Sequence, residues 1–463
     1  MLLPAQNNPF HTLALILLLV GTGLARGEAG PEQPSVTPSV LLERGDHEGA
    51  LALLTEYAEA SAETLAADPD DAKREGLARI LLWLGSTNLE VARSREAEVH
   101  FQRARELLTE AGSSPRLLGI CEDGLGRALH HQGAHEEAAE AFQAALNHRQ
   151  QLEGDDREFW LAATREHLGL LELSRGHYQD AGTSLEAALE ATHSDNPGLR
   201  AQRLASMGRY YHTIRNYARA RATLEEALAR AEEAWGRDHP NTFTILDQLG
   251  LTLLRQGEAA AARAALEEAV DLASAQAGTI PGSLRYASIL NNFSNLLIEE
   301  GEIIKARETF ERALQSLEEK LGPKHAALAP LKNNLAYTYL RDGNHAEAGH
   351  LYREVRTIYL ESVGPDHQRS VEALNNLALA ALLAGHPESP TRIAEAAAAH
   401  QMVLRRILSF GSEIQRLNYL QRVDPMSLPC TTGEDPALIA NLLLRTKGRL
   451  LDSLLAERRT SRD

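Results

Sequence analysis

The chain has 463 residues, enough for two to four ordinary domains or for one elongated solenoid whose units pack only on their neighbours. Ala, Leu, Glu and Arg are abundant and aromatic residues make up 5% of the chain, so we expect an almost wholly helical protein. The formal net charge is −17 and no basic stripe stands out, which argues against nucleic acid as a partner.

Residues 1–25 have the pattern of a secretory signal peptide. An apolar run, Leu13 to Val20, is followed by small residues up to Ala25, and the run is too short for a comfortable membrane span. No Lys or Arg precedes the run, so an uncleaved N-terminal membrane anchor is the alternative. We expect an exported protein, periplasmic or extracellular, that meets a membrane only if this segment stays uncleaved. Residues 26–40 are predicted to be a flexible linker.

Residues 41–408 contain an internal repeat. Turns are predicted at intervals of 43, 39, 42, 44, 42 and 42 residues, at Gly133, Gly176, Arg215, Gly257, Gly301, Gly343 and Gly385. Such a period is typical of repeat architectures in which each unit is a helical hairpin, with helix A before the turn and helix B after it. We predict about eight repeats. The first lacks a clear helix A, and Pro387 and Pro390 are expected to interrupt the last.

Each predicted hairpin carries a small residue seven positions before its turn, and most of these small residues are glycines. They are Gly85, Gly126, Gly169, Gly208, Gly250, Ser294, Ala336 and Ala378. Helix B carries an Ala five residues after the turn and a large apolar residue four positions later. Glycine within a helix costs about 0.5 to 1 kcal/mol relative to alanine, so its recurrence needs a packing reason. We predict that each glycine of helix A faces an alanine of helix B, which lets the two helices approach closely.

The recurring Leu-Gly of helix A and the Ala, Phe and Ala of helix B resemble the tetratricopeptide repeat. The longer period and the loops Trp235–Pro240 and Leu321–His325 resemble the kinesin light chain subtype. The resemblance implies an all-α fold, a right-handed superhelical solenoid of antiparallel helix hairpins. It also implies a scaffold without enzymatic activity, which binds a protein or peptide on its concave helix A face.

A row of polar residues ten positions before the turns lies on that expected face. Amide side chains there can donate to and accept from a peptide backbone, and in kinesin-light-chain-like repeats an asparagine in this context resembles a groove residue. The alternative is that the asparagines tie neighbouring helices together, with help from Asn292, Asn334 and Asn376. The predicted groove residues, including those one helical turn further on, are Asn291, Asn333, Asn375, Asp247, Arg127, Arg209, Asn295 and Tyr337.

No catalytic, metal or cofactor site is predicted. The histidine cluster of His130, His131 and His135 straddles a turn and lacks acidic or cysteine ligands at metal-binding spacing. Cys121 lies in a helical segment and is interpreted as a small buried thiol, whereas Cys430 has no nearby histidine to activate it. The sequence contains no Walker A, HExxH or GxSxG motif.

Residues 409–463 resemble the helical connector that precedes the CHAT domain, a caspase-like fold, in bacterial proteins that join it to tetratricopeptide repeats. The resemblance rests on the segments Leu408–Leu417, Val423–Pro429 and Leu444–Leu455. It implies the regulatory or sensing part of such a system, with a CHAT-domain protein as a candidate partner. The CHAT domain itself is absent from the sequence, so the alternatives are a truncated remnant without independent activity or a free-standing exported adaptor.

Overall fold

A computed structural model describes residues 37–192, 196–362, 364–365 and 368–410. These residues form helices and no strand, which confirms the predicted all-α class. The helices are α2 (Pro38–Glu43), α3 (His47–Ala67), α4 (Asp71–Glu90), α5 (Ser94–Glu110), α6 (Pro115–Gln132), α7 (His135–Arg149), α8 (Asp155–Arg175), α9 (Tyr178–Glu190), α10 (Pro197–Thr213), α11 (Tyr217–Trp235), α12 (Pro240–Gln256), α13 (Ala259–Ala275), α14 (Ile280–Glu299), α15 (Ile303–Leu321), α16 (Leu328–Arg341), α17 (His345–Ser362), α18 (Gln368–Leu383) and α19 (Ser389–Phe410).

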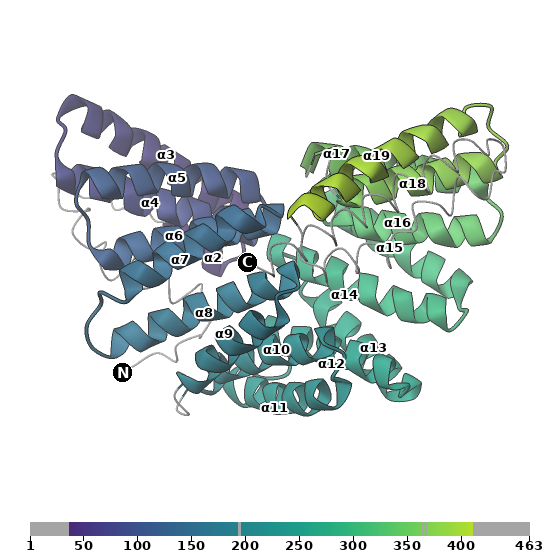
Figure 1. The fold of residues 1–463 in the computed structure, drawn as a ribbon, viewed down its shortest axis with the longest axis horizontal. Coiled ribbons are helices and arrows are strands. Elements are labelled where there is room, and N and C mark those ends of the chain that lie inside the picture. Colours follow the sequence, from purple (N-terminus) through teal and green to yellow (C-terminus); the bar gives the residue numbers. More distant parts are fainter. Residues whose placement is uncertain (1–36, 193–195, 363, 366–367, 411–463) are drawn as a thin grey trace, which may run out of the picture. The chain divides into compact units, whose positions relative to one another are not determined.

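From α4 onward the helices alternate as the repeat predicts, with even-numbered helices as helix A and odd-numbered helices as helix B (Figure 1). Within a hairpin, helix A packs along helix B, as in α4 with α5, α6 with α7 and α16 with α17. Within each unit a helix B also packs on the next helix A, as in α5 with α6 and α17 with α18. These hairpins therefore bury a second apolar edge under a neighbour, as a repeat array requires.

All seven predicted turn residues adopt the left-handed backbone conformation, with φ between 62° and 84°. Glycine suits the end of a helix in this conformation because it has no Cβ to clash. Two non-glycine residues share the conformation: Arg215 at a predicted turn, and Ala92 at the corresponding turn between α4 and α5. The spacing of the turns, including Arg215, is thus confirmed by the backbone.

Local sequence explains where several helices begin. Pro115, Pro197 and Pro240 occupy first turns, where a missing backbone N–H costs no helical hydrogen bond. The side chain of Asn196 accepts a hydrogen bond from the backbone N–H of Leu199 at 3.0 Å and so caps α10.

The expected interruption of the last hairpin is wrong. Pro387 lies in the turn after α18, and Pro390 is the second residue of α19, which runs on to Phe410. A proline in the first turn of a helix is tolerated because its position has no intrahelical partner. The last hairpin therefore has two packed helices like the others.

The recurring glycines of helix A lie closest to the large residue of helix B. A Cβ added to Gly126 would lie 2.7 Å from the ring of Phe142, and one added to Gly208 would lie 2.5 Å from Leu224. The predicted alanine is also close in two hairpins, where a Cβ added to Gly169 or Gly250 would lie 3.2 or 3.4 Å from the backbone oxygen of Ala181 or Ala262. The glycine makes room for a large side chain that seals the hairpin.

The described residues divide into two compact units at Tyr286 and Ala287, within α14. In the first unit, helices α4 to α8 share a core that includes Leu82, Phe101 and Cys121. In the second unit, Ala336, Tyr352 and Leu377 form a corresponding core between α16, α17 and α18. Each unit is thus built from the same hairpin contacts.

The helical region begins at Pro38, slightly before the expected start of the array at residue 41. The predicted signal segment (1–25) and residues 411–463 of the predicted connector lie outside the described residues. None of the helices in the described part combines the length and the apolar character needed to cross a bilayer.

Candidate functional site

In the second unit the paired asparagines form a ladder between neighbouring A helices. The side-chain amide of Asn334 on α16 donates to the side-chain oxygen of Asn291 on α14 at 2.8 Å. One repeat later, Asn376 on α18 donates to Asn333 on α16, also at 2.8 Å. The residue nine positions before each turn thus donates to the residue ten positions before the previous turn.

The first unit makes the same link with different chemistry. His167 on α8 donates to the carboxylate of Asp123 on α6 at 3.1 Å, and Ser206 on α10 donates to Glu166 on α8 at 2.6 Å. These residues occupy the same two positions relative to their turns as the asparagines do. The row of polar residues that we call the ladder, namely Asp123, Glu166, His167, Ser206, Asn291, Asn333, Asn334 and Asn376, is therefore a recurring feature of the A helices.

Buried arginines support the acidic part of the ladder. Arg149 donates to Asp123 at 3.3 Å and to the backbone oxygen of Trp160 at 2.7 Å. Burial raises the pKa of Asp123, but the nearby His167 and Arg149 outweigh burial and hold that pKa below its ordinary value. Arg203 lies 3.9 Å from Glu166 and donates to the backbone oxygen of Ala188 at 3.0 Å. The carboxylate of Asp123 is thus held in its charged form.

The structure brings four of the predicted groove residues together in the second unit. Asn291 and Asn333 are half-buried members of the ladder, and Asn295 lies beside them because its oxygen also accepts from Asn334 at 3.3 Å. Tyr337 follows one helical turn after Asn333, and its hydroxyl lies 3.0 Å from the guanidinium of Arg341. Asn375 sits next to Asn376, and its side chain makes no hydrogen bond within the described residues.

The predicted groove residues of the first unit are more scattered. Arg127 is half-buried one helical turn after Asp123, whereas Arg209 is exposed on α10. Asp247 on α12 is 5% exposed, so its side chain belongs to the interior of the unit. These three residues lie on three different A helices, α6, α10 and α12.

The sequence analysis did not identify two groups of residues in the ladder region. They are the donors His167 and Ser206, and the buried arginines Arg149 and Arg203. His167 and Ser206 stand at the same position as Asn334 and Asn376, so alignment of the repeats on their turns is a signal that finds them. Arg149 and Arg203 stand at different positions relative to their turns. The repeat pattern therefore gives no signal for these arginines.

The histidine cluster does not form a ligand set in the described part of the chain. The ring centre of His130 lies 5.7 Å from that of His135 and 6.3 Å from that of His131. A different group, Glu172, His177 and Asp180, brings three ligand atoms within 4.8 Å of one another. Arg175 and His177 already bind the two oxygens of Glu172, at 2.8 and 2.6 Å, so an ordinary ion-pair cluster accounts for this group.

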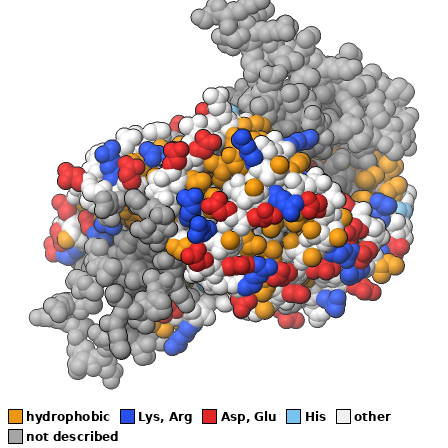
Figure 2. All heavy atoms as spheres, turned by 90° about the horizontal axis from the view of Figure 1, so that it is seen from below, with side chains coloured by type: hydrophobic (Ala, Val, Ile, Leu, Met, Phe, Trp, Pro, Cys, Tyr) orange, Lys and Arg blue, Asp and Glu red, His pale blue; other side chains and the backbone are white. Residues whose placement is uncertain are grey.

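Cys121 and the charged side chains at the surface form no candidate catalytic site among the described residues. Cys121 is buried and its thiol donates to the backbone oxygen of Phe101 at 3.2 Å, while burial raises its pKa well above the ordinary value. A buried, protonated thiol is a poor nucleophile. On the face drawn in Figure 2, acidic and basic side chains are mixed among apolar ones, so that face has no broad area of a single charge.

Comparison with protein families identifies the repeats. Residues 200–275, 285–359 and 328–400 match a model described as tetratricopeptide repeat, and residues 124–155 match a second model with the same description. These segments are tetratricopeptide repeats, and neither model describes an enzyme. No curated protein sequence matches the chain.

Solved structures agree on the fold. The apo form of the quorum sensor NprR from B. thuringiensis superposes with a TM-score of 0.51 at 14% identity, covering 75% of this chain and 97% of that chain. Nearly identical kinesin light chain TPR-like repeats from Podosopora anserina give 0.37 at 20% identity, covering 45% and 98%. A Rap protein complexed with Competence and Sporulation Factor gives 0.45 at 15% identity, covering 81% and 99%. The chain is similar to these proteins in fold, an array of helical hairpins.

Proposed function

We propose that this chain is a scaffold that binds a protein or peptide on the face of its A helices, with the ladder of the second unit as the centre of the site. The ladder occupies the side-chain oxygens of Asn291 and Asn333, and Asn333 donates one amide N–H to Asn334 at 3.4 Å. The amide of Asn291 and the second N–H of Asn333 therefore remain for a ligand. Asn375 adds a third amide in the same row. Amide N–H groups spaced along successive helices suit the backbone carbonyls of an extended or helical peptide.

The observation that carries this proposal is the fixed orientation of the asparagines. A side chain already held by a neighbour loses little conformational entropy when it binds, which favours binding. Asn295 and Tyr337 extend the polar row by one helical turn on the same helices. A repeat fold of this kind belongs to a quorum sensor in NprR, which makes a sensing role a reasonable proposal for this array.

The test begins with peptides selected from a random library on the whole chain. The double variant Asn333→Ala and Asn375→Ala should weaken their binding by about 5- to 150-fold, since each of the two lost neutral hydrogen bonds costs about 0.5 to 1.5 kcal/mol. Asn147→Ala, at an exposed position on α7, is the matched control and should leave affinity unchanged. Unchanged affinity in a folded double variant would remove the A-helix face as the site.

We propose further that the scaffold is the regulatory or sensing part of a system with a CHAT-domain protein. This proposal rests on the resemblance of residues 409–463 to the connector of such proteins. Co-purification with a caspase-like protein would support it, whereas a chain that is recovered alone and stays monomeric would favour a remnant without independent activity or a free-standing adaptor.

We also propose that the chain is exported, on the pattern of residues 1–25. The mass of the mature N-terminus tests this directly. Cleavage near Ala25 supports export, and an intact N-terminus in the membrane fraction supports the uncleaved anchor instead.

A further inference from the structure

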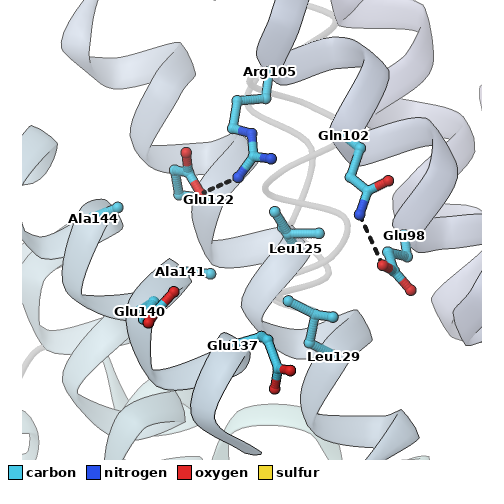
Figure 3. A pocket seen from close by; sticks show the side chains of 10 residues that line it. All are labelled: Glu98, Gln102, Arg105, Glu122, Leu125, Leu129, Glu137, Glu140, Ala141 and Ala144. Atoms are coloured by element: carbon cyan, nitrogen blue, oxygen red, sulfur yellow. Dashed lines mark hydrogen bonds and ion pairs between the residues drawn. The ribbon is translucent and has the colours of Figure 1, made fainter. Parts of the chain in front are cut away.

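The first unit also carries a hollow that shares no lining residue with the ladder. It lies between α5, α6 and α7 and has a volume of about 380 Å³ (Figure 3). Leu125 and Leu129 of α6 and Ala141 and Ala144 of α7 give it apolar surfaces, and carboxylates of Glu122, Glu137 and Glu140 surround them. A hollow with apolar and charged parts can hold a side chain that has both.

Glu122 is the unusual member of this hollow. Its side chain is only 9% exposed, and its one partner in the described structure is the guanidinium of Arg105 at 3.8 Å, with no side-chain hydrogen bond. Burial raises the pKa of Glu122, because the distant Arg105 compensates only part of the lost hydration. Glu140, at the rim, is exposed and has no ion pair within the described residues. The hollow therefore has an excess of negative charge with an incompletely satisfied carboxylate inside it.

In the second unit the corresponding positions are occupied by larger or oppositely charged side chains of the protein. Counted from the turns at Gly133 and Gly343, Lys332 corresponds to Glu122 and Glu354 to Ala144. Lys332 is 4% exposed, and its ammonium group binds Glu354 and Glu318, each at 2.6 Å. In the second unit an internal lysine thus lies between two carboxylates. At the positions of Lys332 and Glu354, the first unit has Glu122 and Ala144.

The apolar positions of the hollow also differ between the two units. Tyr339 corresponds to Leu129 and Leu351 to Ala141, so the second unit has larger side chains at both positions. The hydroxyl of Tyr339 donates to Glu311, and the guanidinium of Arg307 lies 4.9 Å from the centre of the Tyr339 ring. In the second unit these positions hold larger side chains and an internal cation, where the first unit has smaller residues and a carboxylate.

We propose that the hollow binds a lysine or arginine side chain of a partner protein, presented on a helix with a leucine-sized side chain one turn away. The cation lies between Glu122 and Glu140, where the second unit holds its own lysine, and the apolar side chain covers Leu125 and Leu129. Complementary charge and an unfilled apolar surface select this kind of partner over an acidic or wholly polar one. The site is separate from the ladder, so variants of one leave the other intact.

The experiment uses the whole chain and an amidated helical peptide of about 16 residues, long enough to populate a helix, with Arg and Leu four positions apart. Matched peptides carry Gln in place of Arg, or Ala in place of Leu. Fluorescence anisotropy should give measurable binding for the first peptide, and affinity lower by at least about tenfold for each matched peptide.

Two variants decide whether the hollow is the site. Glu122→Lys with Ala144→Glu rebuilds the ion pair of the second unit and should abolish binding. Glu140→Lys changes only an exposed position, keeps the fold intact and should weaken binding by about tenfold. Glu63→Gln, an exposed carboxylate on α3, removes one charge elsewhere and should leave affinity unchanged.

Several outcomes would overturn the proposal. Equal binding of all three peptides would show that neither the Arg nor the Leu side chain enters the hollow. An equal loss in Glu63→Gln would show general electrostatic attraction only. Self-association of the chain that the double variant abolishes would assign the hollow to a second copy of the chain and not to a partner. Peptides selected for the ladder should bind the double variant normally, which keeps the two proposals distinguishable.

Discussion

At the scale of single residues, glycines of helix A let five of the hairpins pack closely. Gly85 and Gly126 leave room for the rings of Phe101 and Phe142, and Gly169 leaves room for Leu185. Sequence reasoning correctly linked these glycines to packing, because a glycine inside a helix costs stability that a contact must offset. It did not identify the large side chain that lies closest to each glycine, since the repeat pattern gives position along a helix but not the direction of the side chains on the facing helix.

Gly126→Ala should destabilise the protein, because its Cβ would lie 2.7 Å from the Phe142 ring. Overpacking of this kind costs about 1 to 3 kcal/mol, measurable by urea unfolding. Gly349→Ala is the matched control, since a Cβ there meets only the Cβ of Ala380 at 4.0 Å. The control should gain about 0.5 to 1 kcal/mol from better helix propensity. A neutral Gly126→Ala would contradict the packing described here.

At the scale of helices, one hydrogen-bonded row joins successive A helices in both units. The sequence left open whether the asparagines contact a ligand or a neighbouring helix, and the structure assigns their oxygens to the neighbour. Asn333 also donates one amide N–H to Asn334 at 3.4 Å, and ligand binding by the remaining N–H groups stays a prediction. The spacing of the repeats does not predict that the oxygen and the N–H groups of one asparagine have different partners.

The A helices of the first unit should also make its stability depend on pH. Burial, together with the positive charges of His135, His131 and Arg209, lowers the pKa of His130 from 6.5 to about 4. The unfolded chain therefore takes up a proton between these values while the folded chain does not, and stability is lost as pH falls from 6.5 towards 4.

Urea unfolding across this range measures the effect. His130→Gln should flatten the loss of stability between these pH values, whereas His386→Gln, an exposed position in the turn before α19, should not. An identical pH dependence in His130→Gln and the unaltered chain would rule out this origin.

At the scale of the whole molecule, the periodicity of the sequence predicted the fold better than individual polar residues predicted a binding site. Turn positions, helix order and hairpin packing follow from glycine spacing and apolar phase, because each repeat makes the same local contacts. The hollow between α5, α6 and α7 could not be predicted in this way, since it depends on differences between repeats, such as Ala144 against Glu354. Pro390 misled the prediction because a proline signals a helix break only when it lies beyond the first turn.

The central claim is that ligands lie on the face of the A helices. A photo-crosslinking side chain placed at Tyr337 on α16 should capture a library-selected peptide, because this residue lies one helical turn from Asn333 in the ladder. The same group placed at Arg353, exposed on α17, should capture none. Crosslinking from the α17 position, with none from position 337, would contradict the account.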